Sequence, residues 1–217
     1  MNAILAMSSF IFPLITFPYV SRILLPEGTG KVSFATSLIS YFAMLAQLGI
    51  PTYGIRTCAK VRDNKEELTR TAQELVIINL VMSIVSYAVF VIALIFVPRL
   101  RAERTLYAIV SLTIIFNVMG MEWLYKALEQ YTYITIRSIV FKFIALVAMF
   151  AFVHQKADYV VYGAITLIAA SGSSVFNLIT THKFIGMRPV GKYHFKRHFK
   201  PIVVFLSLIL ISEPTRH

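Results

Sequence analysis

Long apolar runs restrict what this chain can fold into more than any other feature of its sequence. Six runs of about 20 residues each carry few charges, and a helix of that length crosses a hydrocarbon core about 30 Å thick. They cover residues 3–25, 32–54, 74–97, 106–125, 134–153 and 159–181. With 58% hydrophobic and 14% charged residues, an ordinary soluble domain is excluded. The sequence predicts an all-α polytopic membrane protein with a six-helix transmembrane bundle.

The apolar runs also predict how the chain is divided. The predicted segments are the bundle at 1–182, a basic cytoplasmic linker at 183–200, and the truncated start of a seventh helix at 201–217, too short to cross by itself. The first run contains Pro13 and Pro18, and we expect a kinked, retained helix rather than a cleaved signal. Residues 59–70 predict a short helix on the membrane surface, with Glu66 and Arg70 paired one turn apart.

Basic residues set the expected orientation. Lys and Arg number 21 against 10 Asp and Glu, which in a soluble protein suggests nucleic acid. Here the bases gather between apolar runs, as they do on the cytoplasmic side of membrane proteins. One side holds 14 of them (Arg56, Lys60, Arg62, Lys65, Arg70, Lys126, Arg137, Lys142, Lys183, Arg188, Lys192, Lys196, Arg197, Lys200) and the other 6 (Arg22, Lys31, Arg99, Arg101, Arg104, Lys156). We therefore expect a cytoplasmic N-terminus and a lipid bilayer, not nucleic acid, as the partner.

Patterns typical of catalytic or metal sites are weak. Cys58 is the single cysteine, which rules out an internal disulfide and a cysteine metal cluster. His194 and His198 are four residues apart, but basic neighbours would repel a cation and no third ligand is near. No nucleophile, base and orienting acid have a recognisable spacing. We expect neither an enzyme nor a bound cofactor or metal.

Charged residues within the apolar runs are the candidate site, because each is costly at membrane depth without a partner. The candidate cavity cations are Arg22, Arg56, Lys126, Arg137 and Lys142, and Glu122 is a candidate for coupling or ion pairing. Lys142 lies five residues beyond Arg137, about 7–8 Å deeper along a helix.

Other interpretations of these residues remain open. Lys126 and Arg137 suit an interfacial role beside an aromatic belt of Trp123, Tyr125, Tyr131 and Tyr133. Glu122 suits a plain ion pair with Lys126 as well as a coupling proton. Asn79 and Asn177 suit hydrogen bonds between helices, and the small residues at 169–174 suit close helix packing.

Three stretches resemble a known family. They are FPLITFPYVSRIL at 12–24 with PEGTGKVSF at 26–34, LGIPTYGIR at 48–56, and GMEWLYKALEQY at 120–131. They resemble the bacterial polysaccharide repeat-unit flippases of the Wzx type, within the multidrug/oligosaccharidyl-lipid/polysaccharide exporter superfamily.

The resemblance implies that this chain is the N-terminal lobe of a protein with two six-helix lobes around a central cavity. It also implies that the protein lies in the bacterial cytoplasmic (inner) membrane. The implied activity is movement of undecaprenyl-diphosphate-linked oligosaccharide from the cytoplasmic to the periplasmic leaflet, with a polysaccharide polymerase and chain-length machinery as further partners. This chain departs from the pattern at both ends, since we expect it to begin inside the usual first helix and to lack the second lobe.

Two alternatives remain open, one within transport and one of another class. A drug or small-cation exporter of the same superfamily would have acidic rather than basic cavity residues. A non-transporting membrane scaffold or fragment would insert without moving a substrate.

Overall fold

The computed structural model describes residues 2–186, 188, 190–191 and 193–212, with side chains from residue 11 to residue 204. These residues form helices and turns and contain no strand, which confirms the all-α prediction. The elements are α1 (Asn2–Gln47), α2 (Ile50–Lys60), α3 (Lys65–Phe96), α4 (Pro98–Ala102), α5 (Arg104–Gly120), α6 (Glu122–Ala127), α7 (Tyr131–Phe152), the 3-10 turn η1 (Lys156–Asp158), α8 (Tyr159–Ser171), α9 (Ser174–Thr181) and α10 (Lys196–Ser212).

Five stretches of the described chain are long and apolar enough to cross a membrane, where the sequence predicted six runs. They are Ile11–Lys60, Lys65–Phe96, Arg104–Ala127, Tyr131–Phe152 and Lys156–Thr181. The numbers differ because the first two predicted runs lie in one stretch of 50 residues. At about 1.5 Å per residue that stretch extends about 75 Å, more than twice the thickness of a hydrocarbon core.

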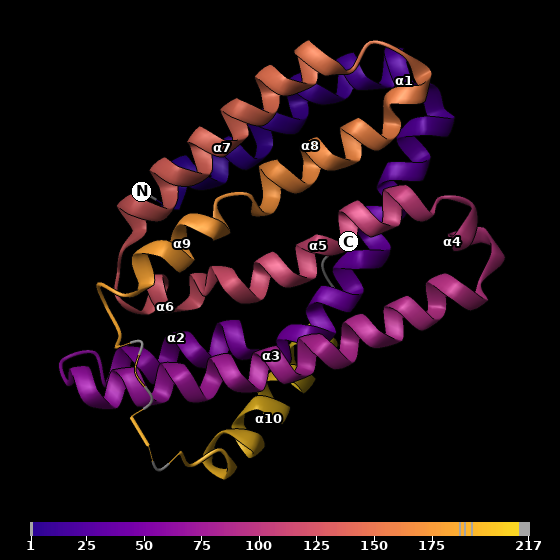
Figure 1. Cartoon of the computed structure of the whole chain (residues 1–217). Coiled ribbons are helices and arrows are strands. Elements are labelled where there is room, and N and C mark those ends of the chain that lie inside the picture. The colour runs from indigo at the N-terminus through magenta and orange to yellow at the C-terminus, as the bar shows by residue number, and fades with distance from the viewer. Residues whose placement is uncertain (1, 187, 189, 192, 213–217) are drawn as a thin grey trace.

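The long first helix bends at Leu25. Its backbone there has φ 58° and ψ 173°, which is not helical, and Pro26 disfavours a helical conformation in the residue before it. Figure 1 shows α1 running to the upper right of the view and then turning back downward. The bend falls at the position where the first predicted run ends.

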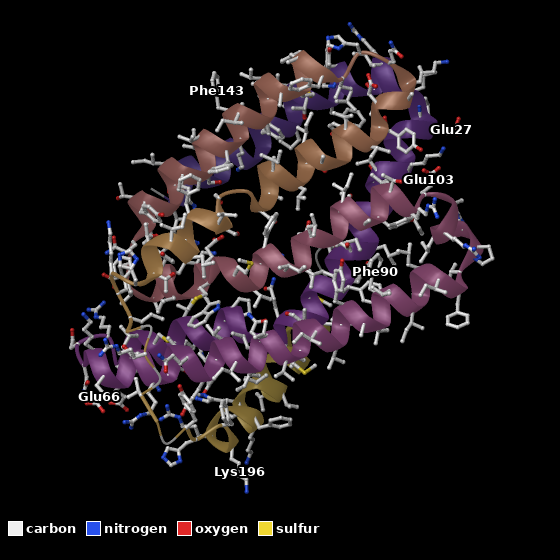
Figure 2. All side chains as sticks on the ribbon, viewed as in Figure 1. Glu27, Glu66, Phe90, Glu103, Phe143 and Lys196 are labelled. Atoms are coloured by element: carbon white, nitrogen blue, oxygen red, sulfur yellow. The ribbon has the colours of Figure 1, made fainter. Side chains whose placement is uncertain are left out.

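The bundle has two ends that differ in charge. We call the end that carries the α2–α3 turn and the α6–α7 turn the basic end, and the end that carries the bend in α1 and the α4–α5 connection the Leu25 end. Figure 2 shows Glu66 at the basic end and Glu27 with Glu103 at the Leu25 end.

The α2–α3 turn differs from the predicted surface helix. Helix α2 ends at Lys60 and α3 begins at Lys65, after Asn64, whose side chain accepts hydrogen bonds from the first backbone N–H groups of α3. The predicted single helix over residues 59–70 is therefore wrong, because this cap starts a new helix. The predicted Glu66–Arg70 ion pair is confirmed at 3.1 Å.

Helix α1 packs against α3, α5, α7 and α8. Its second half contributes Val32, Ala35 and Ile39 to a core with Phe90 and Leu106, while its first half packs with α7 and α8 in a separate core. Figure 2 shows Phe143 pointing away from the bundle, and its exposed fraction is 65%. Such outward apolar side chains suit contact with lipid.

The small residues at 169–174 lie where helix α8 gives way to α9. A Cβ added at Gly172 would lie 2.9 Å from the ring of Phe141 on α7, and Ser171 and Ser173 are buried. The predicted role in close helix packing is confirmed.

Helix α10 begins at Lys196, inside the predicted linker of residues 183–200. It packs against α2, and Ile202 is buried in the core of the basic end. Part of the segment predicted as a seventh helix, residues 213–217, lies outside the described residues.

Candidate functional site

A polar pocket of about 150 Å³ lies between α2, α3, α5, α6, α9 and the end of α1. Its lining residues are Gln47, Pro51, Ile55, Asn79, Asn117, Gly120, Glu122, Trp123, Lys126 and Ser174. Three amide side chains and an ion pair in one pocket are unusual within an apolar bundle, where polar groups are costly.

The pocket exists because α5 and α6 are separate helices. Met121 between them has φ 43°, which places the helix break directly before Glu122. Gly120 allows α5 to approach α9 closely, since a Cβ there would lie 2.5 Å from the hydroxyl of Ser174. Glu122 and Lys126 form an ion pair of 2.8 Å across one turn of α6.

Two buried side chains of the pocket have a polar atom without a partner. Asn79 is 2% exposed and Trp123 4% exposed, and Asn79 Oδ1 and Trp123 Nε1 have no hydrogen-bond partner among the described residues. The interhelical hydrogen bond predicted for Asn79 is therefore missing at this oxygen. The one predicted for Asn177 is confirmed, because its Nδ2 donates to the carbonyl of Gly120 at 2.5 Å.

A tyrosine cluster lies beside α6 and leads to Arg137. The rings of Tyr125 and Tyr133 stack with centroids 5.4 Å apart, and Tyr125 Oη donates to the carbonyl of Asn177 at 2.6 Å. Arg137 lies over the ring of Tyr133 at 5.4 Å. The predicted aromatic belt is wrong for Trp123 and Tyr125, because both are buried inside the bundle.

Arg137 is the most deeply buried of the candidate cations. It is 8% exposed, and its Nε and Nη1 have no partner among the described residues. Glu122 acts on it electrostatically, but that carboxylate is ion-paired with Lys126. The interfacial role considered for Arg137 does not fit this burial.

The other candidate cations are spread over the bundle. Lys142 is half-buried on α7, and Arg56 is exposed on α2, which packs against α6. Arg22 is exposed on the first half of α1, three residues before the bend. The structure thus places Lys126, Glu122 and Arg137 together near the basic end and leaves Arg22 at the Leu25 end.

Sequence reasoning missed a buried cluster around Glu74 on α3. Glu74 is fully buried and accepts hydrogen bonds from Arg197 Nη2 at 2.6 Å and from the His194 backbone N–H at 2.6 Å. His198 Nε2 lies 2.6 Å from the same carboxylate, and its Nδ1 lies 2.8 Å from Tyr53 Oη. Since a carboxylate only accepts, Nε2 of His198 carries the proton and Nδ1 accepts from Tyr53.

This cluster was missed because its members are far apart in the sequence. Glu74 stands where an apolar run begins, and its partners follow about 120 residues later. The histidine spacing drew attention to a metal site, whereas His198 is a partner of Glu74. Burial lowers the pKa of His198 and so does the charge of Arg197, while Glu74 acts in the opposite direction; the net pKa lies below its ordinary value.

A second charged cluster joins helices at the Leu25 end. The carboxylate of Glu103 forms an ion pair with Lys31 at 2.9 Å and accepts a hydrogen bond from the hydroxyl of Tyr159 at 2.7 Å. Burial by itself raises the pKa of Glu103, but these two hydrogen bonds and the charge of Lys31 hold it below its ordinary value. The cluster ties α1 and the start of α8 to the α4–α5 connection.

The apolar helices and the charged and polar side chains buried among them define a multi-pass α-helical membrane protein. A family model described as "Polysaccharide biosynthesis protein" matches residues 1–213, and the chain belongs to this family, as the Wzx-type resemblance predicted.

A putative O-antigen transporter of Escherichia coli (strain K12) is 23% identical to this chain over 213 residues. The match covers 97% of this chain and 51% of that protein, so the chain spans about half the length of the curated relative. No solved structure matches.

Proposed function

We propose that this chain forms one lobe of a transporter that moves undecaprenyl-diphosphate-linked oligosaccharide repeat units across the bacterial cytoplasmic membrane. The direction is from the cytoplasmic to the periplasmic leaflet. Membership of the polysaccharide biosynthesis family and the O-antigen transporter relative support this substrate class.

Arg137 is the observation that carries the proposal. It lies six residues into α7, about 9 Å from the helix start, and it is buried with two unpartnered guanidinium nitrogens among the described residues. A buried charge that its neighbours compensate only in part is costly in free energy. Such a cost is understandable where an anionic ligand completes the pairing.

A lipid diphosphate is an anion of suitable chemistry. It carries about two negative charges, and the planar guanidinium of Arg binds phosphate oxygens in pairs. Lys142 lies further along α7 and Lys126 on α6, so cations follow one another from the basic end inward. Arg56 at the basic end and Arg22 at the Leu25 end suit entry and exit of the same headgroup.

Six membrane crossings fit this role better than five. The 50-residue first stretch is long enough for two crossings and bends at Leu25. Counting its halves separately gives one six-helix lobe of a two-lobed transporter. The excess of Lys and Arg at the basic end supports a cytoplasmic position for that end and for the N-terminus.

The membrane potential would assist the outward half of transport. Two negative charges moving out across an inside-negative membrane gain about 4–5 kcal/mol per 100 mV. Glu122 serves as the ion-pair partner of Lys126 in this scheme, because the two lie 2.8 Å apart. A polysaccharide polymerase and chain-length machinery would take over the delivered repeat units.

A drug or small-cation exporter is the second candidate. It would bind its cationic substrate through an acidic side chain, and Glu122 lines the polar pocket. The charge of Glu122 is already matched by Lys126, so a cation has no unpaired carboxylate there. The arrangement favours an anionic substrate.

Charge substitutions in the natural gene test the proposal. Arg137→Gln and Lys142→Met should lower delivery of repeat units to the periplasmic leaflet about tenfold or more, as expected for a lost charge-assisted hydrogen bond, without lowering membrane abundance. Lys60→Met, which removes an exposed charge from the end of α2, is the control and should leave delivery unchanged. Undiminished delivery by both variants would contradict the proposal and favour a non-transporting scaffold.

A further inference from the structure

The polar pocket contains one unpartnered hydrogen-bond acceptor and one unpartnered donor. The acceptor is Asn79 Oδ1 on α3 and the donor is Trp123 Nε1 on α6, each without a partner among the described residues. Leaving such a group buried without a hydrogen bond is unfavourable, because the group has lost its contact with water. Both residues line the same pocket, so one ligand bound there would lie beside both side chains.

The pocket has the capacity for one six-membered ring. Its volume is about 150 Å³, and an apolar protein cavity of roughly 150 Å³ is known to bind benzene. A purely apolar ring would leave Asn79 and Trp123 unsatisfied. A ring that carries hydroxyl groups would not, because each hydroxyl both donates and accepts.

The charges of the pocket argue against a phosphate group there. Glu122 would repel an anion, and Lys126 is engaged with Glu122 at 2.8 Å. Gln47 and Asn117 contribute two neutral amides to the lining. A neutral, hydroxyl-rich ligand matches this set of groups.

The indole of Trp123 is held in place by packing against helix α2. Gly54 on α2 lies against its ring, since a Cβ at that position would approach the ring to 2.8 Å. A donor fixed by packing loses little side-chain entropy on binding.

We propose that this pocket binds a single sugar ring of the lipid-linked oligosaccharide, with hydroxyl groups donating to Asn79 Oδ1 and accepting from Trp123 Nε1. The inference rests on the proposed function and adds a saccharide site that borders the series of cations at Lys126 but is separate from Arg137 and Lys142, which would hold the diphosphate. Neither Arg137 nor Lys142 lines the pocket. The pocket would then contribute to the choice among repeat units of different sugars.

Trp123 provides the test, because it is the single tryptophan of the chain. The emission of the purified chain in lipid nanodiscs is titrated with a set of hexoses, 6-deoxyhexoses and N-acetylhexosamines, and with glycerol. At least one sugar should give a saturable change, whereas glycerol should not. The emission could instead change linearly with concentration for every sugar, and by the same amount as with glycerol. That result would mean that only water occupies the pocket, and it would overturn the inference.

Variants show whether the response arises in the pocket. Asn79→Ala should weaken the sugar response about tenfold, the loss expected for one hydrogen bond to a buried amide. Ser83→Ala is the matched control, because Ser83 lies one turn further along α3 and is also buried with an unpartnered hydroxyl, yet outside the pocket. Asn117→Ala is a second pocket variant in case Asn79→Ala does not fold. An unchanged response in a folded pocket variant would overturn the proposal.

A second ligand separates this inference from the proposed function. Farnesyl diphosphate carries the headgroup without a sugar, and its binding is measured with radiolabelled ligand. Binding that survives Asn79→Ala and is lost in Arg137→Gln would support two separate sites. If farnesyl diphosphate binds and no sugar does, only the saccharide site is wrong; if farnesyl diphosphate does not bind, the proposed function fails.

Discussion

Arg137 shows how a single residue can oppose stability. A buried guanidinium with unpartnered nitrogens destabilises the lobe, and functional sites commonly retain such groups. Arg137→Gln should therefore be neutral or stabilising, raising the free energy of unfolding by up to about 2 kcal/mol. Denaturant titration of the helical circular dichroism in mixed micelles measures this change. A loss of several kcal/mol would show that Arg137 has a structural partner instead.

His198 makes the attachment of α10 sensitive to pH. Because burial lowers the pKa of His198 below its ordinary value of 6.5, the unfolded chain takes up a proton in acid more readily than the folded chain does. The stability linked to this residue is complete above about pH 6.5 and is lost as the pH falls through the lower, folded value.

We expect the midpoint of thermal unfolding to fall on acidification from pH 7.5 to 5.5, and to fall less in His198→Gln. The groups that face the imidazole are Glu74 on α3, Tyr53 on α2 and Arg197 on α10. An equal fall in both proteins would contradict the prediction.

At the residue scale, the sequence predicted ion pairs within one helix turn, such as Glu66 with Arg70, but not pairs between distant segments. Arg137 and Lys142 stood out because they interrupt apolar runs. Glu74 did not, because it lies at the start of such a run and its partners Arg197 and His198 are distant in the sequence. Pairing of that kind depends on tertiary contacts, which hydropathy patterns do not contain.

At the element scale, glycine positions determine how closely helices approach. A Cβ at Gly120 would lie 2.5 Å from Ser174 Oγ and 3.4 Å from its Cα, so Gly120→Ala forces α5 and α9 apart. We expect a destabilisation of about 1–3 kcal/mol. Gly30→Ala is the matched control, since nothing lies within 4 Å of its added Cβ, and it should be neutral or stabilising by up to about 1 kcal/mol.

Thermal unfolding of both glycine variants checks this prediction. Equal stability of Gly120→Ala and the unaltered chain would mean that α5 and α9 separate without cost. The same contact positions Asn177, which donates to the carbonyl of Gly120, so the variant should also alter the polar pocket.

The apolar runs predicted the long helices well and their ends poorly. Helix α3 begins at Lys65 rather than near residue 74 because Asn64 caps it, and its first turns are polar. The last predicted run is interrupted between Ser171 and Ser174. Helix caps and helix breaks depend on a few local side chains. The mean hydropathy of a long run does not reveal them.

At the scale of the whole molecule, the proposed orientation can be tested by labelling. Cys58 is buried and should not react in the folded protein. Lys156→Cys at the Leu25 end and Lys65→Cys at the basic end both introduce exposed thiols. In spheroplasts, a membrane-impermeant maleimide should label the former and leave the latter unlabelled. The reverse pattern would place the basic end outside.

The central claim is that this lobe receives an anionic glycolipid headgroup on its buried cations. The most direct measurement is equilibrium binding of a radiolabelled polyprenyl-diphosphate-linked saccharide to the purified chain in nanodiscs, with the neutral polyprenol as competitor. We predict saturable binding that weakens with rising salt, falls about tenfold or more in Arg137→Gln, and is not displaced by polyprenol. Binding that polyprenol displaces equally well, or that Arg137→Gln leaves unchanged, would contradict the account.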